Sequence, residues 1–214
     1  MSRPLLLGHR GARATRSIPE NTLFSFDLAI EHGCDGFEFD VRQSADHHAV
    51  ICHDPSFQGI VIADAQAAEL PDLPTLQQVL ARYQSSAFLD IEIKVPGLED
   101  SLLHALQTQP PARGFVVTSF LPEVLHTLRQ SDPDLPLGLL CETHAQFVPW
   151  SALPVRFVLP HFTLMSADLL TAVHASGKKL VTWTVNRPAQ MHQFIELGVD
   201  GLISDDTEAL GKLK

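Results

Sequence analysis

Short runs of apolar residues alternate with segments of helical periodicity along the whole chain. Eight runs have the length and composition of strands, at about residues 5–8, 36–42, 87–94, 115–118, 137–141, 156–159, 179–184 and 201–204. Apolar spacings of three and four, together with start and stop signals, predict helices over about 21–31, 74–83, 98–107, 122–130, 166–175 and 188–197, and after 206. A Pro-interrupted connection near 146–150 predicts only a helical turn. Such alternation implies a parallel sheet.

The number of strand–helix units indicates how the sheet is arranged. Eight units in 214 residues most economically close into a (β/α)8 TIM barrel, so we predict an α/β fold with one domain over residues 1–214. A short run at 50–52 is expected to form an accessory strand. A doubly wound open sheet is the alternative, and it usually carries a glycine-rich phosphate loop after its first strand. Gly-His-Arg-Gly-Ala at 8–12 is not such a loop, which favours the barrel.

Ionisable residues gather where the predicted strands end. Side chains on a strand alternate between its two faces, so Glu38 and Asp40 share one face, as do Glu92 and Lys94. A carboxylate inside an apolar strand needs a partner, because desolvating an unpaired charge is costly. The active sites of TIM barrels lie at the carboxyl ends of their strands. We therefore expect these groups to share one site.

Glu38, Asp40 and Glu92 are the candidate metal ligands. An all-oxygen set of hard ligands suits Mg²⁺ or Ca²⁺, with Mn²⁺ possible. The alternative is that one of the three carboxylates forms a salt bridge with Lys94 or Arg42 in the barrel mouth. We expect one divalent cation as the cofactor.

Two histidines and two basic residues complete the candidate chemistry. His9 and His53 are candidates for an acid–base pair, since imidazole titrates near working pH. A structural hydrogen bond is the alternative for either histidine. Arg10 and Lys94 suit the oxygens of a phosphate group, although both could instead pair with the carboxylates.

Residues after the later strands are candidates for the substrate pocket. Trp183 ends the predicted strand at 179–184, and Phe120 follows the strand at 115–118. Aromatic rings at a barrel mouth either pack together or form a wall against the carbon part of a substrate. His161 and His144 also follow strands and could line the pocket.

Composition excludes several classes of partner. A net charge of −10 argues against nucleic acid, which needs a basic surface. Three cysteines without metal-ligand spacing suggest buried thiols in a reducing compartment. No apolar stretch approaches the roughly 18 residues of a membrane span, and no basic-then-apolar signal opens the sequence. We expect a cytoplasmic protein without stable membrane insertion, which acts on a small molecule.

The motifs carry a family resemblance. His9-Arg10-Gly11 followed by Pro19-Glu20-Asn21-Thr22 resembles the opening of glycerophosphodiester phosphodiesterases. In family order there follow Glu38-Phe39-Asp40-Val41, His53-Asp54, Leu73-Pro74-Thr75-Leu76, Glu92-Ile93-Lys94, Ser119-Phe120, Trp183-Thr184-Val185-Asn186 and Gly198-Val199-Asp200-Gly201. The resemblance implies a barrel that uses a divalent metal to hydrolyse glycerophosphodiesters to glycerol 3-phosphate and an alcohol.

By motif position, the resemblance also implies roles for individual residues. The family's metal ligands fall on Glu38, Asp40 and Glu92, and its catalytic histidines fall on His9 and His53. Its phosphate contacts fall on Arg10 and Lys94.

One departure from the family concerns the segment at 55–73. The family typically inserts a sizeable cap here, whereas this connection is short and lacks the usual Arg-Thr-Thr stretch. We expect recognition to rest on the phosphate and glycerol, with the leaving alcohol facing solvent and broadly tolerated.

Two other functions remain open. A lysophospholipase D-like lipid phosphodiesterase would need an exposed apolar patch beside the site. Candidates for that patch are Phe57, Ile60, Val61 and Ile62. A non-catalytic barrel that serves as a binding domain is disfavoured, because every candidate catalytic residue is present.

Overall fold

The chain forms a closed parallel barrel in a computed structural model that describes residues 3–147 and 150–214. Within those ranges the eight barrel strands are β1 (Leu5–His9), β2 (Gly36–Gln43), β6 (Phe88–Ile93), β7 (Phe115–Ser119), β8 (Leu137–Cys141), β9 (Phe157–Pro160), β10 (Lys179–Thr182) and β11 (Gly201–Ser204). Each strand pairs with its neighbours in parallel, and β1 closes the ring by pairing with both β2 and β11. The predicted TIM barrel is confirmed.

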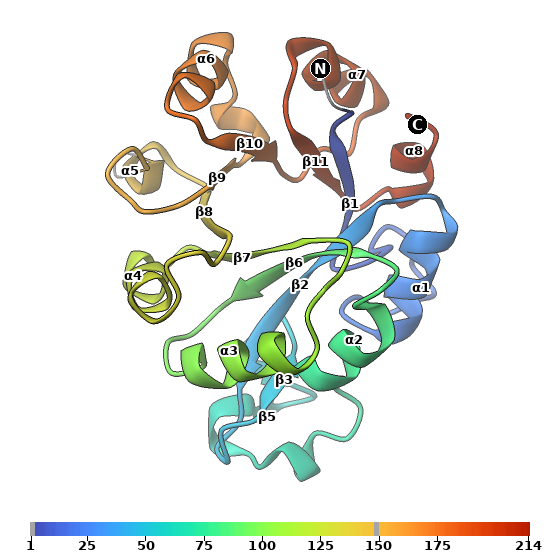
Figure 1. Cartoon of the computed structure of the whole chain (residues 1–214). Helices are drawn as coiled ribbons and strands as arrows, with labels where there is room; N and C mark the ends of the chain where they lie inside the picture. Colours follow the sequence, from blue (N-terminus) through green and yellow to red (C-terminus); the bar gives the residue numbers. More distant parts are fainter. Residues whose placement is uncertain (1–2, 148–149) are drawn as a thin grey trace.

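Helices surround the ring of strands, as Figure 1 shows. They are α1 (Leu23–Glu31), α2 (Leu76–Tyr83), α3 (Glu99–Thr108), α4 (Pro122–Ser131), α5 (His144–Phe147), α6 (Ala167–Ala175), α7 (Pro188–Leu197) and α8 (Thr207–Gly211). The hydroxyl of Thr22 caps the start of α1, and Thr75 caps α2 together with Gln78. The turn expected near 146–150 corresponds to α5, which is one helical turn, and positions 148–149 lie outside the described residues.

The main core lies between the barrel wall and the helices. Phe26 on α1 stacks on Phe37 of β2, with ring centroids 4.2 Å apart, and the edge of Tyr83 on α2 meets Phe37 at 4.9 Å. These aromatic contacts fix both helices against β2. They hold in place the strand that carries two of the candidate metal ligands.

Close approach of β2 to β6 depends on Gly36. A Cβ atom at this position would lie 1.7 Å from the carbonyl oxygen of Phe88, so any other residue would force the strands apart. The close pairing continues along both strands, with Asp40 opposite Glu92. Gly36 thereby helps to set the spacing of the carboxylates farther along the strand.

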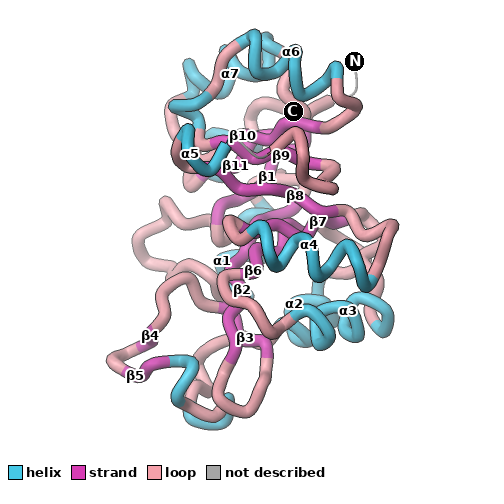
Figure 2. Tube along the Cα trace, turned by 90° about the vertical axis from the view of Figure 1, so that its left-hand side faces the viewer, coloured by secondary structure: helices cyan, strands magenta, loops and turns pink. Residues whose placement is uncertain are grey.

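β2 continues beyond the barrel and carries an appendage. It pairs antiparallel with β3 (Ala49–Ile51), and a small hairpin of β4 (Ser56–Phe57) and β5 (Ile60–Val61) follows. Figure 2 shows this hairpin away from the barrel strands. Short 3₁₀ turns at Ile62–Asp64 and Ala67–Glu69 lead on towards α2. The segment at 55–73 is thus short but folded.

The appendage has a small core of its own. Its members are Val50, Ile62, Ala65, Leu70 and Leu73. Ile62 is only 1% exposed, so its assignment to an exposed apolar patch is wrong: it anchors the turn after the hairpin. Ile60 and Val61 are exposed, at 42% and 47%.

In the described part of the chain, no helix has the length and apolar character needed to cross a membrane. The thiols of Cys34, Cys52 and Cys141 are free, and the first and last of these are buried.

Candidate active site

Strand register brings the three predicted metal ligands together. Asp40 on β2 lies opposite Glu92 on β6, and Glu38 lies opposite His9 on β1. Oxygen atoms of Glu38, Asp40 and Glu92 lie within 4.8 Å of one another, and all three side chains are buried. β2 contributes Glu38 and Asp40, and β6 contributes Glu92, so the carboxylates that the sequence pattern grouped do meet.

Several oxygens of this cluster have no hydrogen-bond partner. Glu38 Oε1 is buried without one. Asp40 Oδ1 and Glu92 Oε1 also make no hydrogen bond of good geometry and face the Lys94 ammonium, at 3.3 and 2.6 Å. Buried acceptors are rarely left this way. The donor set and its unpartnered oxygens fit a hard divalent cation.

Burial of the cluster also disturbs its protonation. Burial raises the pKa of Glu38 well above its usual range, and the charges of Asp40 and Glu92 raise it further. Burial and Asp40 likewise raise the pKa of Glu92 to about 7. Although burial opposes the shift, the charges of Lys94 and Arg10 lower the pKa of Asp40. Glu38 and Glu92 therefore resist ionisation unless further positive charge neutralises them.

Two cations border the cluster, as the pairing alternative predicted. The backbone N–H of Arg10 donates to Glu38 Oε2 at 3.0 Å, while its guanidinium donates to Glu20 at 2.8 Å and lies 3.3 Å from Asp40. Lys94 pairs with Asp40 and Glu92. Arg10 and Lys94 also line the cavity, so both can still face an anionic ligand.

His9 is held by a carboxylate that the sequence analysis did not identify. Its Nδ1 lies 2.6 Å from Asp205 Oδ1. Because an ionised carboxylate can only accept, this bond places a proton on Nδ1 and leaves Nε2 towards the cluster, 3.9 Å from Glu38 Oε2. Asp205 in turn accepts from Asn186 at 2.7 Å and from Arg13 at 3.2 Å.

The electrostatics of the His9–Asp205 pair favour a neutral imidazole beside a carboxylate. Burial lowers the pKa of His9, although the hydrogen bond that its Nδ1 donates to Asp205 opposes that shift. Burial alone would raise the pKa of Asp205, but its bonds to His9 and Asn186 lower it to about 2.

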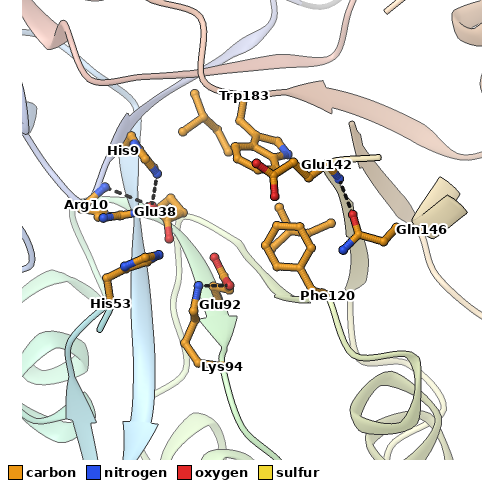
Figure 3. Close-up of a pocket in the computed structure, with 12 residues that line it drawn as sticks. His9, Arg10, Glu38, His53, Glu92, Lys94, Phe120, Glu142, Gln146 and Trp183 are labelled. Carbon is orange, nitrogen blue, oxygen red and sulfur yellow. Dashed lines mark hydrogen bonds and ion pairs between the residues drawn. The ribbon is translucent and has the colours of Figure 1, made fainter. Parts of the chain in front are cut away.

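His53 lies on the same side of the cavity as His9 and is more open to solvent. Figure 3 shows both imidazoles on the same side of the cavity, with Glu38 between them. The side chain of His53 is 36% exposed, and its Nδ1 lies 2.7 Å from Asp54 Oδ1. Arg42 donates to the carbonyl oxygen of His53 at 2.8 Å instead of pairing with the carboxylates. The appendage thus supplies one of the two imidazoles.

The predicted groups surround a cavity of about 460 Å³. Its lining residues are His9, Arg10, Glu38, His53, Glu92, Lys94, Phe120, Leu140, Glu142, Gln146, Trp183 and Ile203. Asp40 is not among the lining residues, but its carboxylate lies 3.3 Å from both Arg10 and Lys94. This volume is that of a small-molecule site.

Aromatic and polar residues form the wall opposite the histidines. The rings of Phe120 and Trp183 meet edge to face with centroids 5.6 Å apart. His161 packs against Trp183 at 5.2 Å and bonds Thr163, outside the set of residues that line the cavity. Gln146, which was not predicted, accepts from the backbone N–H of Glu142 at 2.9 Å, and both residues line the cavity.

Sequence comparisons agree with this geometry. The profile of the glycerophosphoryl diester phosphodiesterase family matches residues 9–209. The glycerophosphodiester phosphodiesterase of Caldanaerobacter subterraneus is 30% identical, and the alignment covers 96% of each chain. Human glycerophosphodiester phosphodiesterase 1 is 27% identical over 68% of this chain and 49% of its own.

Solved structures share the fold. The glycerophosphodiester phosphodiesterase of Thermotoga maritima superposes with a TM-score of 0.85 at 26% identity, over the whole of both chains. A phosphodiesterase of Oleispira antarctica, in complex with the product sn-glycerol-3-phosphate, has a TM-score of 0.86 at 23% identity, covering 98% of this chain and 96% of its own.

Proposed function

The chain belongs to the glycerophosphoryl diester phosphodiesterase family and is an enzyme that hydrolyses glycerophosphodiesters. We propose that it uses one divalent cation and the imidazoles of His9 and His53 for this reaction. The observation that carries the proposal is the cluster of three buried carboxylates, in which Glu38 Oε1 has no partner, beside a cavity that both imidazoles also line. A phosphate diester is a stable anion, so its cleavage needs charge neutralisation and two proton transfers.

Glu38, Asp40 and Glu92 would hold the cation. When bound, the cation would neutralise phosphate charge and lower the pKa of an attacking oxygen. The oxygen donor set favours Mg²⁺ or Ca²⁺, with Mn²⁺ as a third candidate. Arg10 and Lys94 would bind the remaining phosphate oxygens, and the T-shaped pair of Phe120 and Trp183 would pack against the glycerol carbons.

The surroundings of the two imidazoles suggest separate roles. His9 is bonded through Nδ1 and has an unprotonated Nε2 towards the cluster, which suits proton abstraction from the attacking oxygen. That oxygen belongs to water or to the glycerol hydroxyl next to the phosphate. His53 lies at the more open side of the cavity, which suits proton donation to the leaving alkoxide.

The ligand of a structural neighbour supports the substrate class. The Oleispira antarctica enzyme was solved with sn-glycerol-3-phosphate, which is one of the two products expected here. A cavity of about 460 Å³ with Arg10 and Lys94 at its edge accommodates such a small phosphate ester.

Two features support a reduced cap at 55–73. The segment contains only a hairpin and two 3₁₀ turns. The alignment with the Caldanaerobacter enzyme spans 237 positions, more than the 214 residues of this chain, so that relative carries segments this chain lacks. We propose that the cap is one of them. A cytoplasmic location remains a prediction that rests on the three free thiols.

A lysophospholipase D-like activity is the second candidate. The exposed Ile60 and Val61, which form β5 of the hairpin, could meet the acyl chain of a lipid substrate. With Ile62 buried, this patch is smaller than the sequence suggested.

One assay tests the proposal. Release of glycerol 3-phosphate from glycerophosphocholine is measured with EDTA, and again after Mg²⁺, Ca²⁺ or Mn²⁺ is added back. We expect activity to be lost in EDTA and restored by at least one cation. Full activity in excess chelator would overturn the metal assignment. Hydrolysis of lysophosphatidylcholine to choline and lysophosphatidic acid, without release of glycerol 3-phosphate from glycerophosphocholine, would favour the second candidate.

A further inference from the structure

A second hollow lies beside the active-site cavity, on the appendage side of His53. It has a volume of about 590 Å³ and is lined by residues from 19–22, 51–54, 56–58 and 72–73. His53 is the residue that lines both this hollow and the active-site cavity. A group bonded to an oxygen that His53 protonates would therefore lie next to the second hollow.

The walls of this hollow combine apolar surface with carboxylates. Ile51, Phe57 and Leu73 contribute apolar and aromatic surface. Glu20, Asp54 and Asp72 contribute carboxylates, and no lysine or arginine of the described chain is among its lining residues.

The three carboxylates are not equally neutralised. Glu20 pairs with Arg10 and Arg13, and Asp54 pairs with His53. Asp72 forms neither an ion pair nor a side-chain hydrogen bond with any described residue. The hollow thus keeps a net negative charge beside its apolar walls, which repels anionic groups and attracts cationic ones.

We propose that this hollow binds the leaving alcohol of the diester and prefers an alcohol with a quaternary ammonium group, of the choline type. The inference rests on the proposed function, because it takes His53 as the group that protonates the leaving oxygen. A quaternary ammonium spreads its charge over methyl groups and has no N–H to donate. It is therefore stabilised by an aromatic face and nearby carboxylates without needing hydrogen-bond acceptors of fixed geometry.

Other head groups match these walls less well. A primary ammonium loses hydrogen bonds to water when it meets the apolar surface of Ile51 and Leu73. Polyol head groups such as glycerol and inositol would bury hydroxyls against the same surface.

The proposal changes the expectation drawn from the short connection. Ser56, Phe57, Gln58, Asp72 and Leu73 all belong to this connection or its last residues, and they form part of the wall of the hollow. The connection therefore provides a surface for the leaving group, instead of leaving it free in solvent. We therefore expect a preference for choline among the leaving alcohols instead of broad tolerance.

The test compares catalytic efficiencies for glycerophosphocholine, glycerophosphoethanolamine, glycerophosphoglycerol and glycerophosphoinositol. We expect the choline diester to exceed the glycerol and inositol diesters by about tenfold, the combined scale of a cation–π contact and a partly screened charge. Asp72→Asn and Phe57→Ala should each raise KM for the choline diester about threefold or more. The change in kcat/KM for the glycerol diester should be smaller than that for the choline diester in both variants. Asp64→Asn, which changes an exposed carboxylate of the same connection outside the hollow, is the matched control.

Specific outcomes would overturn the inference. Equal kcat/KM values for the choline and glycerol diesters would overturn it. An Asp72→Asn variant that loses kcat/KM equally for both diesters would overturn it too. A Phe57→Ala defect confined to lysophosphatidylcholine would show that the hollow holds an acyl chain instead.

A binding experiment separates this inference from the proposed function. Saturation-transfer NMR detects free choline on the wild-type protein and on Asp72→Asn, independently of turnover. Choline binding that weakens in the variant supports the hollow even if no diester is hydrolysed. Absence of choline binding at millimolar concentration, in an enzyme that hydrolyses diesters, overturns the hollow alone.

Discussion

His9 and Asp205 come from opposite ends of the chain and meet through a bond of 2.6 Å between Nδ1 and Oδ1. The parallel pairing of β1 with β11 makes the contact possible, because His9 ends one strand and Asp205 follows the other. Asn186 and Arg13 hold the carboxylate from the other side. The imidazole is therefore held with its free nitrogen towards the carboxylate cluster before any substrate binds.

Asp205→Asn should lower kcat by one to two orders of magnitude, somewhat less than the roughly hundredfold or greater loss expected for His9→Ala. Asp205 raises the pKa of His9, so its removal should move the limb of the pH–rate profile that belongs to His9 to lower pH. Asp206→Asn is the control, because asparagine can still cap α8. A loss of kcat with an unmoved pH profile would mean that Asp205 has only a structural role.

Asp54→Asn should lower kcat less than Asp205→Asn does, although Asp54 accepts a hydrogen bond from His53 in a similar way. The side chain of Asp54 is 73% exposed against 16% for Asp205, so water and salt screen its interaction. We expect a loss of less than about fivefold in kcat, against about two orders of magnitude for His53→Ala. Equal losses in Asp54→Asn and Asp205→Asn would contradict this ranking by exposure.

Divalent cations should stabilise the fold as well as support activity. At a concentration of 100 Kd, a cation that binds only the folded state adds about 2.7 kcal/mol to the free energy of unfolding. Urea unfolding with and without Mg²⁺, Ca²⁺ or Mn²⁺ measures this gain. Glu38→Gln should abolish the gain and the activity, yet make the cation-free protein more stable, because it removes a buried carboxylate beside two others. Glu123→Gln, on the exposed face of α4, should behave as the wild type.

Stability at alkaline pH should depend on the buried thiol of Cys34. Burial, reinforced by the charge of Asp35, raises the pKa of this thiol from about 9 to about 12. The protonated thiol is thus favoured in the folded state, and its contribution is complete below pH 9 and lost as pH rises towards 12. The loss is about 1.4 kcal/mol per pH unit.

Cys34→Ala lacks this titration. The difference in the free energy of unfolding between wild type and variant should therefore shrink by about 2 kcal/mol between pH 9 and 10.5. A constant difference over this range, measured by urea unfolding, would mean that Cys34 ionises in the folded state as readily as in the unfolded state.

The sequence predicted which candidate site residues share a face of a strand, because that depends only on strand periodicity. Two-residue spacing was enough to put Glu38 with Asp40, and Glu92 with Lys94, on common faces of their strands. Barrel closure then determined that these faces meet. The roles assigned to the residues remain predictions.

The sequence did not predict contacts between side chains that follow different strands. Asp205 directly follows the last strand, where the rule applied to the other strand ends would have marked it. Its bond to His9 depends on the closing pair of strands, which no local pattern encodes. His161 follows a strand in the same way, yet it lies behind Trp183, because the end of a strand does not fix where a loop side chain points. The hairpin at 56–61 is too short and too exposed to produce a periodic signal.

The separate small core of the appendage has a consequence for the loss of activity in denaturant. His9 belongs to the barrel wall, whereas His53 follows β3, whose Val50 packs in the appendage core with Ile62, Ala65, Leu70 and Leu73 while Ala49 and Ile51 pack in the main core. A cluster this small can open with far less free energy than the barrel needs to unfold. Mild denaturant should therefore abolish activity reversibly at concentrations where the circular dichroism spectrum is still that of the intact barrel. Amide hydrogens of residues 62–70 should exchange well before those of β6. The working enzyme thus depends on the less stable of its two folding units.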